Sequence, residues 1–268
     1  MRRPAMVSDL TDETIAGFLA WYSSQRLYRW SKRMPVPRTV NKLRDQLLAL
    51  AKLAQQKGLL REVPDVRSLP EYHHTPEAYN PADINALLVA CRALPHSYCG
   101  IPAGLYWQAA ILVSYDTGIR SGTLWQLQLT DVSLSSRSIR FRAETQKNRQ
   151  AQILRIHSQT VAAIHKIWQP EREPLFPWAA HPQTRINHYR KILIAAGLPT
   201  GRMEMMHKLR RTTATLMHNA GGDATQQLGH SSDAVTRRSY IAPDLSQQAC
   251  DLLPRPVLPD DDPQLTLF

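Results

Sequence analysis

Cysteine and long apolar runs are both scarce in this sequence of 268 residues. The three cysteines, Cys91, Cys99 and Cys250, show no C-x-x-C spacing, so they indicate neither a zinc site nor a disulfide framework. The paired His73-His74 lacks cysteine or carboxylate partners at ligand spacing, so no metal site is predicted there. No apolar run approaches the ~18 residues that span a bilayer, and no signal-peptide core follows the basic N-terminus. We therefore expect a soluble, intracellular, cytoplasmic protein without a membrane partner.

Acidic residues are also in short supply. The chain has 22 Asp and Glu against 33 Lys and Arg, which gives a formal net charge of +11 and a pI of about 9.9. Such an imbalance favours a polyanionic partner, with nucleic acid as the first choice and an acidic membrane surface as the second. Hydrophobic residues make up 43% of the chain, which is enough for a buried core and excludes wholesale disorder.

The first part of the chain predicts a small, basic, all-helical domain over residues 8–66. Thr11 is a predicted helix N-cap, because its hydroxyl can accept from the free N–H groups of the first turn. Apolar residues then recur at helical spacing over 40–54, and Gly58 follows as a helix-ending residue. Residues 67–80 are a predicted linker, since prolines punctuate a polar stretch there.

Residues 81–253 predict a second domain in which helices accompany a β-hairpin. Asn80 is a predicted N-cap, with Pro81 at the first helical position. A two-residue alternation over 138–142 and 151–156, around a polar turn, predicts the two strands of the hairpin. The expected fold class is therefore mainly α with a small β-hairpin or sheet, followed by a flexible tail over 254–268. The helices predicted in this domain cover residues 81–94, 103–115, 158–168, 184–196, 206–220 and 233–240.

Two residues of the predicted helix 206–220 suggest phosphate chemistry. His207 and Arg210 are three apart, so both side chains project from one helix face. An arginine fork suits two non-bridging phosphate oxygens, and a histidine exchanges protons near neutral pH. An H-x-x-R pair alone is too short to be diagnostic, but further polar residues surround it in a definite order. These are Arg120 in Asp116-Thr117-Gly118-Ile119-Arg120, Lys147 in Gln146-Lys147-Asn148-Arg149, His230 in Leu228-Gly229-His230-Ser231-Ser232, and Tyr240 after Thr236-Arg237-Arg238-Ser239.

The order Arg, Lys, His-x-x-Arg, His, Tyr resembles the tyrosine recombinase (phage integrase) family, strongly over residues 80–245. The N-terminal helices resemble the family's core-binding domain more loosely. The resemblance implies a two-domain tyrosine recombinase, with a helical core-binding domain and a mixed α/β catalytic domain. It also implies site-specific DNA recombination or integration. The hydroxyl of Tyr240 would attack the scissile phosphate to give a 3′-phosphotyrosyl link and a free 5′-hydroxyl, and a hydroxyl of another strand would then reverse that attack. Because the link conserves bond energy, the family needs neither ATP nor a metal, so no cofactor is expected.

The resemblance and the chemistry of phosphoryl transfer together assign roles to the charged residues. Arg120 and Arg210 would face the negative charge that gathers on the equatorial oxygens. A tyrosine has a reference pKa near ~10, so His207 is the candidate acceptor of the Tyr240 proton. His230 would be a second hydrogen-bond donor to the phosphate.

The leaving 5′-oxygen needs a general acid, because it departs poorly as an alkoxide. Lys147, on the predicted hairpin turn, matches the family's catalytic lysine. Arg149 on the same turn is its rival for this role and otherwise a DNA-contact candidate.

Three features depart from the family pattern. Thr123 stands where the family has an acidic residue, which is expected to weaken the orientation of Arg120. The segment over 220–230 is short, consistent with a tight glycine turn. Ser239 is an extra residue before the tyrosine, and a one-residue shift rotates a helical side chain by about 100°, so the local backbone must compensate.

The two domains are expected to clamp duplex DNA, with strongly salt-dependent binding and a nucleoid-associated location. Strand exchange in this family needs four protomers on two sites, which implies a homo-tetramer on DNA. The last five residues, Gln264-Leu265-Thr266-Leu267-Phe268, resemble the peptide by which bacterial replication proteins bind the sliding clamp, and docking onto another protomer is the alternative. The phosphate-contact candidates of the first domain are Arg26, Arg29, Lys32, Arg33, Arg38, Lys42 and Arg44.

Two other functions remain open at this point. A type IB topoisomerase would use the same chemistry to relax supercoils, and a recombinase-derived protein could bind DNA without catalysis. The mobile genetic element or chromosomal process served by a recombinase is also open: phage integration, transposon movement, integron-like capture or chromosome-dimer resolution.

Overall fold

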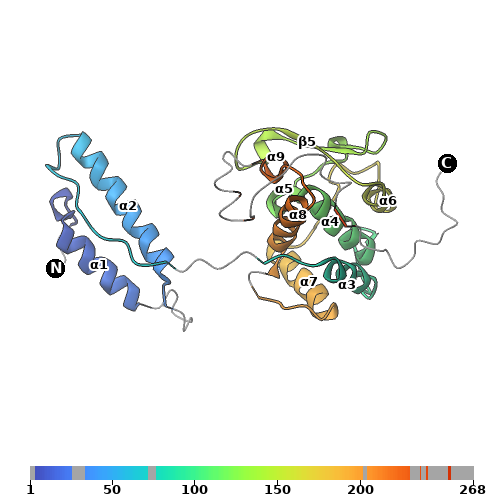
Figure 1. The fold of residues 1–268 in the computed structure, drawn as a ribbon, viewed down its shortest axis with the longest axis horizontal. Helices are drawn as coiled ribbons and strands as arrows, with labels where there is room; N and C mark the ends of the chain where they lie inside the picture. The colour runs from blue at the N-terminus through green and yellow to red at the C-terminus, as the bar shows by residue number, and fades with distance from the viewer. Residues whose placement is uncertain are drawn as a thin grey trace. The chain divides into compact units, whose positions relative to one another are not determined.

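The computed structural model describes residues 4–25, 34–71, 77–201, 204–229, 236, 240 and 253–254. The chain divides into two compact units, residues 1–75 and residues 76–268 (Figure 1). The expected fold class, mainly α with a small sheet, is confirmed. No helix in the described part of the chain is both long enough and apolar enough to cross a membrane.

The first unit is a pair of helices closed by an extended segment. After a short 3₁₀ turn, Val7–Asp9, helix α1 runs over Asp12–Ser24 and helix α2 over Pro37–Gln56. The Thr11 hydroxyl caps α1 as predicted, accepting from the N–H of Thr14 at 3.2 Å. Asn41 on α2 then fixes the extended segment, because its side chain both donates to and accepts from the backbone of Leu69, at 2.9 and 2.8 Å.

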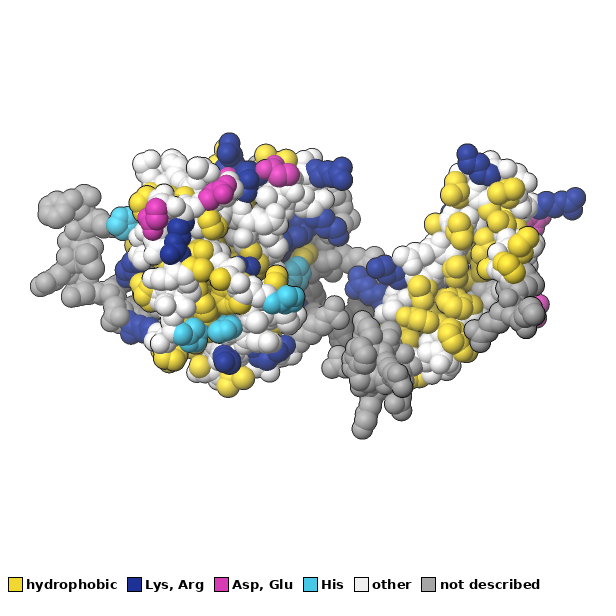
Figure 2. Space-filling model, turned by 180° about the vertical axis from the view of Figure 1, so that it is seen from behind, with side chains coloured by type: hydrophobic (Ala, Val, Ile, Leu, Met, Phe, Trp, Pro, Cys, Tyr) yellow, Lys and Arg dark blue, Asp and Glu magenta, His cyan; other side chains and the backbone are white. Residues whose placement is uncertain are grey.

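The hydrophobic core of this unit is small. Only Ile15, Leu19, Val40 and Val66 form its buried cluster among the described residues. Large apolar side chains remain exposed on the same helices, and Figure 2 shows hydrophobic side chains gathered on one face of the unit. They include Phe18, Trp21, Leu50 and Leu53.

Helix α4, Ala103–Thr117, is the centre of the second unit. It buries 12 of its 15 residues, as expected for a helix that is apolar on all sides. Helices α3 (Pro81–Arg92), α6 (Ser158–Lys166) and α8 (His207–Asn219) pack around it. Asn80 caps α3 as predicted, accepting from the N–H of Asp83 at 2.8 Å.

A three-stranded antiparallel sheet lies beside these helices. The predicted hairpin is formed by β4 (Ser138–Phe141) and β5 (Gln152–Arg155). A third strand, β3 (Val132–Ser133), pairs with the other edge of β4, and a separate ribbon joins β1 (Ser97–Tyr98) to β2 (Ile101–Pro102). Neither of these was predicted, because a two-residue strand is too short to show an alternating pattern.

Three more helices complete the described part of the second unit: α5 (Ser121–Leu124), α7 (Pro182–Ala195) and α9 (Ala224–Leu228). Only α7 was predicted, since helices of four and five residues carry no periodic signal. Short 3₁₀ turns lie at Leu129–Asp131 and Ala143–Thr145. The predicted helix 233–240 falls outside the described residues except at positions 236 and 240.

Candidate active site

The first arginine of the predicted set follows a sharp turn between α4 and α5. Gly118 ends α4 in the left-handed conformation, with a φ of 61°. A β-carbon at this position would lie 2.6 Å from a methyl of Leu228 and 3.3 Å from Thr213, so only glycine fits. The turn leads through buried Ile119 to Arg120, which is half-buried at the N-cap of α5.

The second arginine, Arg210, is almost completely buried in α8, with 1% of its surface exposed. Its Nη1 donates to the carbonyl of Gly118 at 2.6 Å, and its Nη2 donates to the carbonyl of Leu228 at 2.9 Å. Burial, followed by the positive charge of Arg120, lowers the pKa of Arg210 to about 10. The guanidinium therefore remains charged near pH 7 and is held in a fixed direction between α4 and α9.

A buried ion pair anchors the start of α8, close to His207. Lys208 Nζ lies 2.6 Å from Glu204 Oε2 and 4.7 Å from the centre of the Tyr79 ring. The backbone N–H of Tyr79 in turn donates to Thr212 Oγ1 at 2.8 Å. These contacts fix the turn of α8 from which His207 projects.

His207 and Tyr240 meet directly, although 33 residues separate them in the sequence. The Tyr240 hydroxyl lies 3.1 Å from His207 Nε2, and the Arg210 guanidinium carbon is 5.9 Å from the centre of the tyrosine ring. Partial burial lowers the pKa of His207, and the charges of Arg210, Arg211 and Arg120 lower it further. The imidazole is thus kept neutral, which is the form that can accept a proton.

Lys147 lies exposed on the turn between β4 and β5, as predicted, and Arg149 is exposed on the same turn with a φ of 54°. On one side, Thr123 Oγ1 donates to the carbonyl of Thr145 at 2.8 Å. On the other, Asn148 Nδ2 donates to a carbonyl at the end of α9 at 2.8 Å. The turn is therefore tied to the helices on both sides of it.

The structure thus brings four of the six predicted catalytic residues into one cluster: Arg120, His207, Arg210 and Tyr240. Lys147 stands on the adjoining hairpin. His230 lies outside the described residues, although Gly229 just before it is described. Ser239, the extra residue before the tyrosine, also lies outside them, as does the paired His73-His74.

The predicted DNA-contact residues of the first unit fall into two groups. Arg38 and Lys42 are exposed on α2. Arg44 is half-buried, donating to the carbonyl of Val66 and pairing with Asp45 at 2.8 Å. The remaining candidates lie outside the described residues, together with the terminal Gln264, Leu265, Leu267 and Phe268: they are Arg26, Arg29, Lys32 and Arg33.

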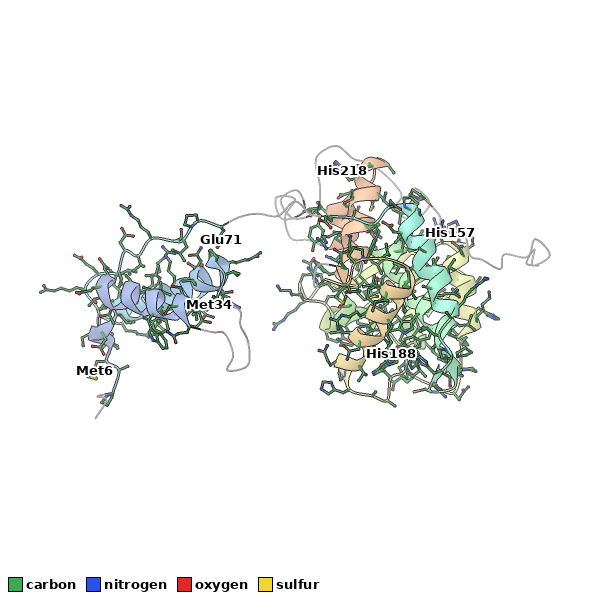
Figure 3. All side chains as sticks on the ribbon, turned by 90° about the horizontal axis from the view of Figure 1, so that it is seen from below. Met6, Met34, Glu71, His157, His188 and His218 are labelled. Atoms are coloured by element: carbon green, nitrogen blue, oxygen red, sulfur yellow. The ribbon has the colours of Figure 1, made fainter. Side chains whose placement is uncertain are left out.

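Two supporting residues were missed by sequence reasoning. Asp116 is fully buried and accepts from the backbone N–H of His157 at 2.8 Å and from Thr160 Oγ1 at 2.6 Å, which joins α4 to the start of α6 (His157 is labelled in Figure 3). Asn148 bonds to a residue 81 positions away. No local pattern reports such long-range partners, so neither role had a signal in the sequence.

A cavity of about 290 Å³ opens beside His207. Its walls include Gly122 of α5, Trp125 and Tyr189. Arg185 of α7 also lines it and places its guanidinium carbon 4.4 Å from the centre of the Trp125 ring. The cluster therefore borders an apolar, aromatic recess rather than flat surface.

A comparison with solved structures identifies the fold. The integrase of transposon Tn1549, solved with circular intermediate DNA, aligns with a TM-score of 0.67 at 16% identity, over 89% of this chain and 83% of that one. XerH site-specific recombinase in a post-cleavage complex with palindromic difH aligns with a TM-score of 0.67 at 17% identity, over 90% of this chain and 70% of that one. A lambda integrase dimer bound to a COC′ core site aligns with a TM-score of 0.66 at 17% identity, over 92% of this chain and 86% of that one. At these identities the likeness establishes a shared fold.

The sequence itself settles the family. The profile of the phage integrase family matches residues 79–246, more than half of the chain, while no curated protein sequence matches it. The chain therefore belongs to the phage integrase family, the tyrosine recombinases, and as an enzyme it is a site-specific recombinase.

Proposed function

We propose that this recombinase cleaves and rejoins DNA through a covalent 3′-phosphotyrosyl intermediate on Tyr240. The observation that carries the proposal is the contact between the Tyr240 hydroxyl and His207 Nε2, at 3.1 Å, beside a buried arginine. This arrangement joins a nucleophile, a neutral proton acceptor and a fixed positive charge, as nucleophilic attack on a phosphodiester requires.

In the proposed step, Tyr240 Oη forms a bond to phosphorus while the bond from phosphorus to the 5′-oxygen breaks. The phenolic proton passes to His207 Nε2, and the ammonium of Lys147 gives a proton to the departing 5′-oxygen. Arg120 and Arg210 would face the negative charge on the non-bridging oxygens. Rejoining reverses these transfers with a 5′-hydroxyl from another strand, so the reaction as proposed uses no metal and no nucleotide.

His230 is proposed as a further hydrogen-bond donor to the same phosphate. The end of α9 supports this, because Arg210 and the hairpin fix the carbonyls of Leu228 and Gly229 beside the cluster, and Gly229 immediately precedes His230 in the sequence. Arg149 is proposed to contact the DNA backbone from the hairpin turn rather than to replace Lys147 as the acid.

We propose that residues 8–66 form a DNA-binding domain of the core-binding type, that 67–80 link it to a catalytic domain over 81–253, and that 254–268 form a tail. Exposed Arg38 and Lys42 would contact phosphates together with Arg26, Arg29, Lys32 and Arg33. Three structural neighbours, the Tn1549 integrase, XerH and lambda integrase, were solved on DNA, which supports a double-stranded DNA partner. Location with the nucleoid would follow from this binding.

Assembly into a tetramer on DNA is also proposed. The exposed apolar side chains of α1 and α2, among them Phe18 and Trp21, offer a surface for contact between protomers. The terminal Gln264-Leu265-Thr266-Leu267-Phe268 is proposed to bind the sliding clamp. A pull-down that compares the full chain with one lacking 264–268 tests this, and equal recovery of the clamp would refute it.

The main proposal is tested by trapping adducts. The protein is mixed with nicked fragments of DNA from its own locus, denatured in detergent, and the attached DNA is sequenced, with Tyr240→Phe in parallel. Adducts at one short site, absent from the variant, are the expected result. Adducts at scattered sequences would favour a topoisomerase, and no adducts with either protein would favour a DNA-binding protein without catalysis.

A further inference from the structure

The C-terminal end of α9 offers backbone carbonyls to two separate parts of the site. The last four carbonyls of a helix have no donor within the helix and need outside partners. Here the carbonyl of Leu228 accepts from Arg210 Nη2 at 2.9 Å, and the next carbonyl, of Gly229, accepts from Asn148 Nδ2 at 2.8 Å. One short helix end therefore holds both the buried arginine and the hairpin that carries Lys147.

A second side chain of the hairpin strengthens this junction, and Figure 1 shows α9 beside β5. Gln152 Nε2 donates to the carbonyls of Gln226 and Gln227, at 2.8 and 2.9 Å. Gly229, with a φ of 60°, allows the close approach, because a β-carbon there would lie 3.1 Å from Gln152 Oε1 and 3.3 Å from Asn148 Nδ2. The hairpin thus packs directly against the backbone that leads to His230.

The opposite side of the turn is fixed by Thr123, which is 3% exposed and donates to the carbonyl of Thr145. In the sequence, Lys147 lies between Thr145 and Asn148, the two residues of the turn that make these hydrogen bonds. The Lys147 side chain is exposed, so the direction in which this side chain projects depends on the backbone of the two adjacent residues. Asn148 is the neighbour whose side chain makes the bond to α9.

We propose that Asn148 is a positioning residue for leaving-group protonation: its bond to Gly229 fixes the turn so that Lys147 reaches the 5′-oxygen. The inference rests on the proposed function. As the bond from phosphorus to the 5′-oxygen breaks, the Lys147 proton moves to that oxygen, and Asn148 itself exchanges no proton. General acids contribute about 10²- to 10⁴-fold, and a misplacement of about 1 Å costs about 100-fold. We therefore expect loss of the bond to slow cleavage about 10- to 100-fold.

Two variants remove the donor in different ways. Asn148→Ala removes the whole amide. Asn148→Asp keeps an oxygen at Oδ1, which accepts from the N–H of Gln150 at 3.3 Å, and replaces the amide that reaches Gly229 with a carboxylate oxygen that cannot donate and is repelled by the carbonyl. Gln150→Ala is the matched control, because Gln150 is exposed on the same turn and its backbone bond survives truncation of the side chain.

The readout is the cleavage rate on two versions of the duplex recovered from the Tyr240 adducts, one with a normal 5′-oxygen and one with a 5′-bridging sulfur at the scissile phosphate. A thiolate leaves without a proton, so the sulfur substrate does not need the acid. We expect both Asn148 variants to be slow on oxygen and within about threefold of the unmodified protein on sulfur. Gln150→Ala should match the unmodified protein on both.

Lys147→Ala separates the two possible failures. If Lys147→Ala remains slow on the sulfur substrate, Lys147 is not the acid, and that part of the proposed function fails together with the role of Asn148. If Lys147→Ala cleaves the sulfur substrate at the normal rate but the Asn148 variants remain slow on it, the proposed function stands and the positioning role is overturned. The positioning role is also overturned if the Asn148 variants cleave the oxygen substrate at the normal rate.

Discussion

Replacement of Gly118 by alanine tests whether the catalytic arginines are held by the close approach of α4, α8 and α9. A left-handed alanine costs about 1–2 kcal/mol relative to glycine. The new β-carbon would also lie 2.6 Å from a methyl of Leu228, which is 1% exposed and has little room to move. Overpacking of this kind costs about 1–3 kcal/mol. The free energy of unfolding should therefore fall by about 2–5 kcal/mol.

Gly197 provides the control. It follows α7 with a φ of 69°, and a β-carbon at that position would meet nothing within 4 Å. Gly197→Ala should therefore cost only the left-handed conformation, about 1–2 kcal/mol. The smaller entropy of the unfolded chain after a Gly→Ala change is common to both variants and cancels in the comparison.

Urea unfolding followed by tryptophan fluorescence measures the difference. The signal reports mainly the second unit, because all of the tryptophans except Trp21 and Trp30 lie there. Gly118→Ala should also slow cleavage, since the Gly118 carbonyl is an acceptor for Arg210. If the two glycine variants lose equal stability, the close approach of Gly118 to Leu228 adds no cost to a β-carbon at this position, and the arginines are not held by that packing.

Three further predictions concern the same cluster. Arg210→Lys should slow cleavage about 100-fold or more, because one ammonium cannot replace a fork that bonds two carbonyls; a rate within threefold in single-turnover cleavage would contradict this. Lowering the pH protonates His207 and removes the acceptor of the Tyr240 proton. Because the pKa of His207 lies below its usual ~6.5, the cleavage rate should stay level down to about pH 6.5 and fall only below that pH. A fall already complete at pH 7 would show that another group controls the rate. Thr123→Val should lower the free energy of unfolding by about 1 kcal/mol, because the carbonyl of Thr145 loses its donor, whereas Thr123→Ser should not; urea unfolding distinguishes them.

The sequence was most informative where local patterns carry the signal. Thr11 and Asn80 cap helices as predicted, because N-cap preferences depend on a few adjacent residues. The hairpin of β4 and β5 is present as predicted. It could be predicted because apolar and polar residues alternate over several consecutive positions in each strand. The meeting of His207 with Tyr240 followed from their order in a family pattern, which no local propensity could supply.

What the sequence did not reveal are contacts between distant segments. The partners of Asn148 and Asp116 depend on how α9 packs on the hairpin and how α4 packs on the start of α6. In the sequence, neither residue differs from an ordinary polar residue. Thr123 illustrates the same limit. Its difference from the family's acidic residue was visible, but its hydrogen bond to Thr145, across 22 residues, became visible only in the folded chain.

The claim that Tyr240 is the nucleophile is tested most directly by locating the covalent bond. The trapped adduct is digested with nuclease and protease, and the peptide that retains a nucleotide is sequenced by tandem mass spectrometry. The expected product is a nucleotide joined through its 3′-phosphate to Tyr240, and Tyr240→Phe should give no such peptide. A nucleotide on another residue, such as the adjacent Ser239, or one joined through a 5′-phosphate, would rule out the 3′-phosphotyrosyl link.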